Sequence, residues 1–398
     1  MAGNRPKLAA ITTVYRKYSH TQQVIDRYLE GYGWDGAHHH PEMDLIALYV
    51  DQVGRDDLSR DRAARFPAMK IYPTIAEALT CGTGKLAVDG VVVVGEHGDY
   101  PKNEKGQTKY PRHEFFQQIV DVFRASGRSV PVFSDKHLSW NWTWAEEMYQ
   151  TSRKMDFVLM AGSSLPVTWR IPSIEMPFGA SVREALCVCY GGVDSYDFHG
   201  LESIQCMVER RKAGETGVRW LRAYRGDRFW KALAEGAWSA DLLQAALCRS
   251  HTLTPARSGF NDILPALEQM QRLAADPIAY TYEHEDGLRC TMLLMNGLVK
   301  DFNFAARLNG TSQIFSTQLY LPMPDGRTTL ASFFSPLVYH MEQMFLTGRA
   351  RYPVERTLLT TGLTASGVES LYAQQARVET PHLAIHYQAA PESTFERS

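Results

Sequence analysis

Ionisable side chains follow several short apolar runs of this chain. Glu96, His97 and Asp99 come directly after one run, and Lys136 and His137 follow another. Carboxylates and imidazoles exchange protons or bind metal ions, and a lysine in a cleft can hydrogen-bond a reacting hydroxyl. Gathering such groups costs free energy unless each is paired or solvated. We therefore expect a catalytic or binding site here, and the alternative is a solvated rim of ion pairs.

The apolar runs alternate with helical patterns over the first 165 residues, as in a βαβα fold. Strands are expected at 7–14, 45–50, 88–94, 130–133 and 157–161. Helices are expected at 19–32, 74–79, 114–125 and 143–154, the first of them capped by Ser19 and Gln22. The pattern predicts an α/β fold with a Rossmann-like, doubly wound parallel sheet, which binds ligands beyond the carboxyl ends of its strands. The segments at that edge are 15–20, 51–55, 95–101 and 134–140.

The second half mixes strand-like and helical runs, which predicts an α+β domain. Strands are expected at 184–190, 218–224, 277–282, 288–296 and 317–321, and helices at 201–211, 227–236, 239–248 and 263–274. We expect a boundary near residue 165, with domains at 1–165 and 166–398. His38 to His40 are expected in an exposed loop, and the tail from Ala389 is expected to be frayed.

Composition excludes several classes of protein. The 398 residues carry 42 Lys and Arg against 44 Asp and Glu, so a net charge of −2 gives no field that favours nucleic acid. The chain contains no apolar run long enough for a membrane span and no signal-peptide core at its start, which favours a cytoplasmic protein. Its six cysteines form no CxxC pair, and Cys187 and Cys189 are expected in the core of a strand.

In order along the chain, five pieces resemble the glucose–fructose oxidoreductase and inositol dehydrogenase family, Gfo/Idh/MocA. They are Asp51 after the second strand, residues 72–79, residues 135–137, Gly191-Gly192 followed by His199, and residues 345–371. The resemblance implies a Rossmann domain followed by a domain with an open, mostly antiparallel sheet. It also implies a C-terminal helix at about 355–375 packed back on the first domain, and a homo-oligomer formed through the open sheet face.

The resemblance further implies an oxidoreductase that uses NAD or NADP on a sugar-like small molecule. Lys136 and His199 would handle the proton, and Asp51 would hold the cofactor ribose. The chain departs from the family in three places. Residues 14–20 contain no glycine, Lys136 is flanked by Asp and His in place of Glu and Pro, and Asp197 stands where glycine is usual. The missing glycines normally let the backbone approach a pyrophosphate, although Arg16 and Lys17 offer charge for one.

Three hypotheses follow for the site and its function. The candidate catalytic residues are Lys136, His199, His97 and Asp197; the candidate cofactor contacts are Asp51, Arg16, Lys17, Ser19 and Glu96; the candidate ligands of a divalent metal are Glu96, His97, His137, His199 and Glu202. The first hypothesis is an NAD(P)-dependent oxidoreductase. The second is a non-redox lyase, isomerase or hydrolase, assisted by metal or by acid–base groups, that keeps the fold. The third is a non-catalytic binding protein.

Overall fold

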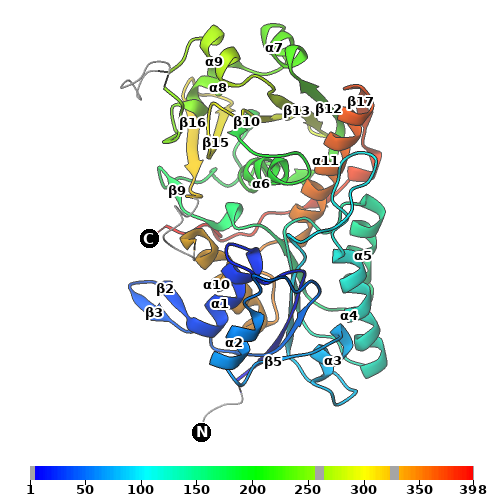
Figure 1. The fold of residues 1–398 in the computed structure, drawn as a ribbon. Coiled ribbons are helices and arrows are strands. Elements are labelled where there is room, and N and C mark those ends of the chain that lie inside the picture. The colour runs from blue at the N-terminus through cyan, green and yellow to red at the C-terminus, as the bar shows by residue number, and fades with distance from the viewer. Residues whose placement is uncertain (1–4, 256–263, 323–330, 398) are drawn as a thin grey trace.

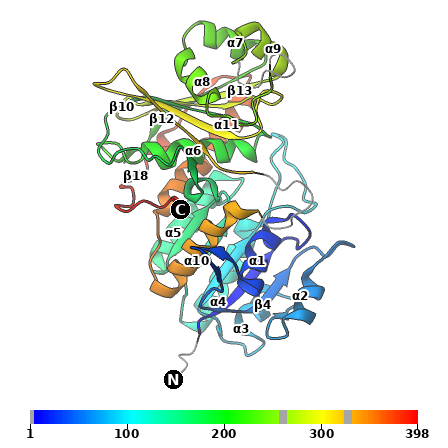
Figure 2. The same ribbon diagram turned by 90° about the vertical axis from the view of Figure 1, so that its left-hand side faces the viewer.

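Two large β-sheets, of six and eight strands, dominate the fold, with helices between them and around them (Figures 1 and 2). The computed structural model describes residues 5–255, 264–322 and 331–397. The first sheet comes from the first 162 residues and the second from residue 170 onward. This division gives the α/β architecture that the alternation of patterns predicts.

The first sheet is parallel throughout, with strand order β5-β4-β1-β6-β7-β8. Its strands are β1 (Lys7–Thr12), β4 (Asp44–Val50), β5 (Lys70–Ile71), β6 (Gly90–Val94), β7 (Val132–Asp135) and β8 (Leu159–Gly162). Its helices are α1 (His20–Glu30), α2 (Ser59–Arg65), α3 (Ile75–Thr80), α4 (Arg112–Ser126) and α5 (Trp142–Lys154). All five predicted strands are confirmed, and the missed β5 has only two residues. The predicted doubly wound sheet is therefore confirmed.

Alternate residues of β1 enter different cores. Leu8 and Ala10 pack into the core that contains α1, whereas Ala9 and Ile11 pack into the core beneath α3, α4 and α5. All five residues of β6 are buried. A strand covered on both faces has no polar face, which explains the unbroken apolar run in the sequence. These buried strands fix the edge at which their polar successors emerge.

The histidine triplet lies in a hairpin, so the predicted loop is wrong. Strands β2 (Tyr32–Trp34) and β3 (Ala37–His39) pair in antiparallel fashion. His38 and His40 are exposed, but His39 contacts Glu342 of helix α10 (Ser335–Thr347) at 2.6 Å. A glycine turn between two short strands carried too little apolar signal to be recognised as a hairpin.

The second sheet is mostly antiparallel, with order β17-β12-β13-β14-β10-β15-β16-β9 and one parallel pair, β10 with β14. Its strands are β9 (Arg170–Ile171), β10 (Val182–Cys189), β12 (Val218–Arg225), β13 (Ile278–His284), β14 (Arg289–Leu294), β15 (Phe302–Leu308), β16 (Ile314–Leu319) and β17 (Arg377–Glu379). Strands β11 (Glu215–Thr216) and β18 (His386–Tyr387) form a separate pair. Sequence reasoning missed β15, in which the polar Asn303 is fully buried among apolar residues.

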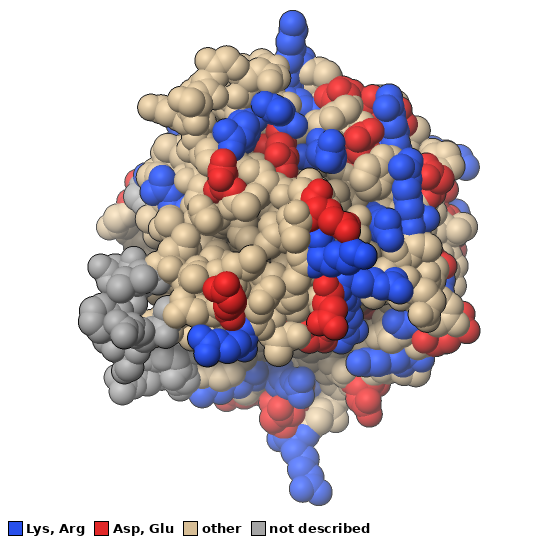
Figure 3. Space-filling view, turned by 90° about the horizontal axis from the view of Figure 1, so that it is seen from above, with Lys and Arg blue, Asp and Glu red and all other residues tan. Residues whose placement is uncertain are grey.

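Helices cover both faces of this sheet. Helices α6 (Tyr196–Val208) and α11 (Val354–Tyr372) pack on the face toward the first sheet. Helix α11 also contacts β8 and α5 of the first sheet layer. Helices α7 (Asp227–Ala234), α8 (Ala240–Leu247) and α9 (Leu267–Leu273) lie over the outer face, where the resemblance implied an open surface for self-association. Lys, Arg, Asp and Glu side chains are interspersed on the surface seen from that side (Figure 3).

The last residues pack against the molecule, which corrects the expectation of a frayed tail. The Arg170 guanidinium lies 4.0 Å from the centre of the Phe395 ring, and His340 Nε2 lies 2.7 Å from the Thr394 carbonyl oxygen. An aromatic residue within a polar segment provides this anchor. In the part of the chain that the structure describes, no helix is both long and apolar enough to cross a bilayer.

Helix α8 covers the outer face of the second sheet within a single chain. Truncating Leu243, a buried residue of α8, should therefore lower the stability of the protein and leave its oligomeric state unchanged. Leu243, 2% exposed, belongs to the same core as Leu186 and Val188 of β10. We expect Leu243→Ala to lower the free energy of unfolding by about 3 kcal/mol. Denaturant unfolding and light scattering measure the two quantities. Leu267→Ala, at a 47% exposed site of α9, is the matched control. A molar mass that changes in Leu243→Ala and not in the control would contradict the claim that α8 covers this sheet face within one chain.

Candidate active site

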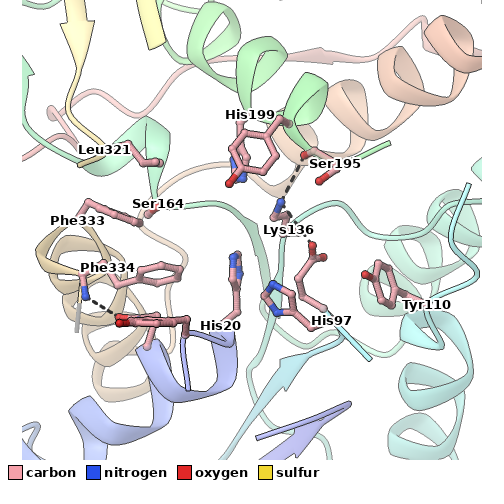
Figure 4. Close-up of a pocket in the computed structure, with 15 residues that line it drawn as sticks. His20, His97, Tyr110, Lys136, Ser164, Ser195, His199, Leu321, Phe333 and Phe334 are labelled. Carbon is pink, nitrogen blue, oxygen red and sulfur yellow. Dashed lines mark hydrogen bonds and ion pairs between the residues drawn. The ribbon is translucent and has the colours of Figure 1, made fainter. Parts of the chain in front are cut away.

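A cavity of about 320 Å³ lies at the carboxyl edge of the first sheet, and α6 closes it from the side of the second sheet (Figure 4). Its polar lining brings together four of the predicted residues: Glu96, His97, Lys136 and His199. Glu96 and His97 follow β6, Lys136 follows β7, and His199 lies in the first turn of α6. The structure therefore places these strand-end residues and the histidine of α6 around one cavity, and their roles in a functional site stay a prediction.

Three non-glycine residues that line this cavity have a left-handed backbone. Tyr18, His97 and Lys136 have φ values of 65°, 68° and 65°, and they follow β1, β6 and β7. Each such residue costs about 1 kcal/mol or more, because its Cβ crowds the backbone. The chain thus keeps strained turns at three neighbouring strand ends, and all three side chains line the same cavity. Strain concentrated in this way is typical of functional sites.

A buried ion cluster forms the polar wall. Glu96 accepts a hydrogen bond from Arg112, and Lys136 Nζ lies 3.6 Å from its other carboxylate oxygen. Burial opposes ionisation of Glu96, but the charges of Lys136 and Arg112 hold its pKa well below the usual value. Arg112 NH1 also lies 3.2 Å from Nε2 of His137, which therefore sits behind Glu96 and outside the cavity lining. One carboxylate thus holds two buried cations.

Lys136 keeps a donor for a ligand. Its ammonium hydrogen-bonds the Ser195 carbonyl oxygen at 3.4 Å and is ion-paired with Glu96. An ammonium has three N–H donors, so at least one has no hydrogen-bond or ion-pair partner among the described residues, although the nitrogen also lies 5.6 Å from the centre of the Tyr196 ring. The side chain is only 3% exposed. A substrate oxygen beside this nitrogen would meet a fixed, poorly hydrated positive charge.

Two neutral imidazoles face the same space. Burial, followed by the charges of His20 and Lys136, lowers the pKa of His97 to about 4, although nearby carboxylates oppose the shift. Burial and the Lys136 charge also hold the pKa of His199 well below its usual value. Nδ1 of each ring is buried and has no hydrogen-bond partner among the described residues. A neutral imidazole can accept a proton, so both rings are available as bases at neutral pH.

His20 is a functional candidate that sequence reasoning missed. It is the first residue of α1 and lines the cavity. Its Nδ1 lies 2.7 Å from Oδ2 of Asp135, whose side chain is fully buried. If Nδ1 donates to this carboxylate, Nε2 is left as the acceptor. The available signal was its place in the predicted strand-end segment 15–20, but nothing nearby in sequence pointed to Asp135, 115 residues away.

The opposite wall is apolar and comes largely from beyond residue 320. Leu321, Phe333 and Phe334 line it, and the Phe334 ring lies 5.0 Å from that of His20. Tyr110 and Tyr196 complete the aromatic lining. A small molecule with one polar edge and one apolar face suits this cavity. No motif in the sequence placed these phenylalanines near the histidines.

Asp197 and Glu202 are also outside the cavity lining. Asp197 accepts hydrogen bonds from the backbone N–H groups of Asp194, Ser195 and Phe198 and from the Tyr280 hydroxyl. Burial raises its pKa, while these donors oppose the shift. Glu202 accepts from the backbone and hydroxyl of Ser163, and burial raises its pKa to about 7. In the described residues, Asp197 therefore fixes the start of α6 and makes no contact with His199.

The candidate metal ligands are not arranged as a metal site. Among residues 5–255, 264–322 and 331–397, no group of three or more His, Cys, Asp and Glu side chains is placed to hold an ion. Glu96 is bound to cations, and His137 faces Arg112. Glu202 lies apart, against Ser163. The geometry brings together proton-transfer groups and not a coordination shell.

Solved structures provide the comparison with known proteins. A probable dehydrogenase from Thermotoga maritima aligns with a TM-score of 0.54 and 12% identity, over 95% of this chain and 99% of that chain. Myo-inositol dehydrogenase from Lactobacillus casei, solved with NAD(H) and myo-inositol, aligns with a TM-score of 0.56 and 11% identity, over 94% and 97%. A Gfo/Idh/MocA family oxidoreductase from Vibrio cholerae aligns at 0.51 and 13%, over 93% and 99%.

The chain has the Gfo/Idh/MocA fold. The alignments run along nearly the whole of both chains, so they include both sheets. At 10–14% identity they show the fold alone. No family sequence model and no curated protein sequence matches this chain. The resemblance drawn from five short pieces of sequence is thus confirmed at the level of the fold.

A second hollow, of about 250 Å³, lies between the turns that follow β1 and β4, at the edge where a fold of this kind binds a dinucleotide. Arg16, Gly54, Asp56, Asp57 and Gly98 are among its lining residues, and Gly98 directly follows His97 of the cavity. The Arg16 side chain makes no ion pair with any described residue. An unpaired guanidinium beside exposed glycine backbone suits a phosphate. Arg16 is therefore one donor for a phosphate of NAD or NADP, whereas the carboxylates of Asp56 and Asp57 in the same lining oppose an anion, and the usual glycine-rich turn is absent.

The other predicted cofactor contacts lie elsewhere. Both carboxylate oxygens of Asp51 accept hydrogen bonds from tyrosine hydroxyls, those of Tyr49 at 2.8 Å and Tyr100 at 2.7 Å. Lys17 lies over the Tyr18 ring, outside both hollows. Ser19 is buried and accepts from the N–H of Gln22 as the cap of α1. Of the predicted set, Arg16 and Glu96 line the hollow and the cavity respectively.

The lowered pKa of His97 predicts a measurable pH dependence. An unfolded histidine binds its proton below about pH 6.5, whereas the folded His97 stays neutral down to about pH 4. Its contribution to stability is therefore complete above pH 6.5 and is lost as the pH falls toward 4. The free energy of unfolding should fall between pH 8 and pH 5. We expect this fall to be about 2 kcal/mol smaller in His97→Gln than in the unsubstituted protein. Denaturant titrations at both pH values, with exposed His38→Gln as control, test this; equal losses in both variants would contradict a buried neutral ring.

Proposed function

We propose that this chain is an oxidoreductase that acts on a hydroxyl-bearing or carbonyl carbon of a small polyhydroxylated molecule, with NAD or NADP. One observation carries the proposal: a buried lysine and a neutral histidine, from different sheet layers, face one small cavity at the ligand-binding edge of this fold. Similar structures are of dehydrogenases, one of them solved with NAD(H) and myo-inositol. That fold-level likeness supports the reaction class.

The two residues have complementary tasks. In oxidation, the free N–H of Lys136 donates to the reacting oxygen and stabilises the negative charge that develops on it. Neutral His199 accepts the hydroxyl proton through its unpartnered Nδ1 or through its other nitrogen. Glu96 keeps the ammonium fixed and charged. A nicotinamide cofactor, held in part by Arg16, supplies or accepts the hydride when it is bound.

The remaining lining orients the substrate. Nε2 of His20, whose ring is fixed through Asp135, forms a hydrogen bond with a second hydroxyl. Phe333 and Phe334 offer an apolar surface to the C–H face of a ring. A volume of about 320 Å³ accommodates a single small ring and not an oligomer. Myo-inositol and related polyols are therefore the first substrates to test.

A second candidate function is favoured by the contacts between the β1–α1 and β4–α2 turns. The Tyr15 carbonyl oxygen accepts from Leu58 N–H at 2.7 Å, Arg16 and Asp57 form a β-bridge, and Asp51 is held by two tyrosines. These contacts hold the two turns together and so reduce the space between them, in which part of a dinucleotide would have to bind. Without a cofactor, the same lysine and histidines would catalyse proton transfer next to a carbonyl, as a lyase or isomerase does.

Cofactor binding separates the two candidates. We expect NADH or NADPH to bind, with nicotinamide fluorescence enhanced on titration, and Arg16→Ala to weaken binding about tenfold through the lost charge-assisted contact. Arg55→Ala removes an exposed arginine of a neighbouring turn and serves as the control. If neither cofactor binds at millimolar concentration, and deuterium from solvent enters a keto sugar in the absence of cofactor, the non-redox candidate replaces the oxidoreductase.

Catalysis tests the roles of Lys136 and His199. With a substrate found by screening polyols against NAD and NADP, we expect Lys136→Met and His199→Ala each to lower kcat at least about 100-fold. The exposed Lys212→Met should retain full activity. Circular dichroism of each variant separates loss of catalysis from loss of fold. Full activity in both variants would show that the cavity is not the active site.

A further inference from the structure

A second binding region lies on the far side of the 102–110 loop from the cavity. It is an open groove of about 680 Å³ between that loop, the start of α5 and the middle of α11, and we call it the Trp140 groove. Figure 1 shows the loop passing beside α11 above α5. Its principal lining residues are Lys102, Lys105, Lys109, Trp140, Ser366 and Glu369. None of these residues lines the cavity described above.

The charges of the groove are only partly matched. Three lysines and two carboxylates, Glu104 and Glu369, line it, which leaves a net charge of +1. Lys105 pairs with Glu369, but Lys102 and Lys109 form no ion pair with any described residue. Lys109 instead lies over the Trp140 ring, 5.8 Å from its centre. The groove therefore presents two unpaired cations, one of them fixed against an aromatic surface.

The groove is preformed, because its loop is tied down at several points. Asn103 accepts from the backbone N–H groups of Lys105 and Gln107, both at 3.0 Å. The Gln107 side chain donates to the Trp140 carbonyl oxygen and to Asp194, both at 3.1 Å. A ligand would meet a rigid surface and lose little free energy in ordering it.

We propose that the Trp140 groove binds a carboxylated saccharide. An indole surface packs against the C–H face of a sugar ring, and amide, hydroxyl and carboxylate side chains such as Asn141, Ser366 and Glu369 exchange hydrogen bonds with its hydroxyls. Lys102 and Lys109 pair with the sugar carboxylate. A net charge of +1 suits a ligand with few charges. A nucleotide triphosphate would bring several negative charges against Glu104 and Glu369.

Calorimetric titration of the full chain with galacturonic acid, which carries one carboxylate, tests the proposal directly. We expect micromolar to millimolar binding that weakens as the salt concentration rises from about 20 to about 200 mM. Lys102→Ala and Lys109→Ala should each weaken it about tenfold, as expected for one charge-assisted contact, and Trp140→Ala should weaken it at least as much. Lys212→Ala is the matched control, and Lys136→Met, in the cavity, should leave this affinity unchanged.

Four outcomes overturn the proposal. They are no heat with galacturonic acid at millimolar concentration, equal affinity for neutral galactose, tighter binding of ATP, and binding lost in Lys136→Met but kept in the groove variants. Because the lysine variants remove only exposed side chains, their effect does not depend on whether Trp140→Ala folds. None of the groove residues lines the cavity, so these outcomes do not test the proposed oxidoreductase activity, which is tested by the cavity variants.

Discussion

The ion cluster around Glu96 is the interaction on which the functional edge of the first sheet depends. One carboxylate, 7% exposed, holds Arg112 from α4 and Lys136 from the turn after β7. Removing one member of a buried cluster leaves an uncompensated charge, which typically costs about 3–5 kcal/mol. The cluster therefore fixes the strained turns at 97 and 136, and it keeps a lysine charged in a place from which water is largely excluded. Burial, together with this charge, lowers the pKa values of His97 and His199 and so keeps both rings neutral.

Both halves of the chain contribute residues to the lining of the cavity. The first half contributes the charged wall and two histidines at strand ends. The second half contributes His199 and the apolar wall of Leu321, Phe333 and Phe334. Because α11 contacts both β8 and β12, one long helix joins the layers that carry these walls. The proposed chemistry needs both, since Lys136 and His199 must reach the same oxygen atom.

Much of the fold could be predicted because its signals are local. Apolar runs such as 90–94, the capping serine of α1 and the alternation of patterns each reflect short-range physics. What failed depends on contacts between distant segments. The hairpin at 32–39 is stabilised by α10, and β15 tolerates a buried asparagine because Asp301 and Gln318 hydrogen-bond it. The cover over the outer sheet face likewise arises from helices whose packing partner the sequence did not reveal.

The candidate site was predictable to the same extent. Glu96, His97, Lys136 and His199 meet because topology alone brings strand ends together and the resemblance supplied the histidine. His20 was missed because its partner Asp135 is far away in sequence, and Asp51 looked available because its tyrosine partners could not be foreseen.

A crystal structure grown with NADH and a polyol that stabilises the protein tests the central claim most directly. We predict polyol density in the cavity, with a hydroxyl oxygen within about 3.2 Å of Lys136 Nζ and a second polar contact to His199. Polyol density outside the cavity, with Lys136 still bound only to Glu96 and Ser195, would contradict the claim.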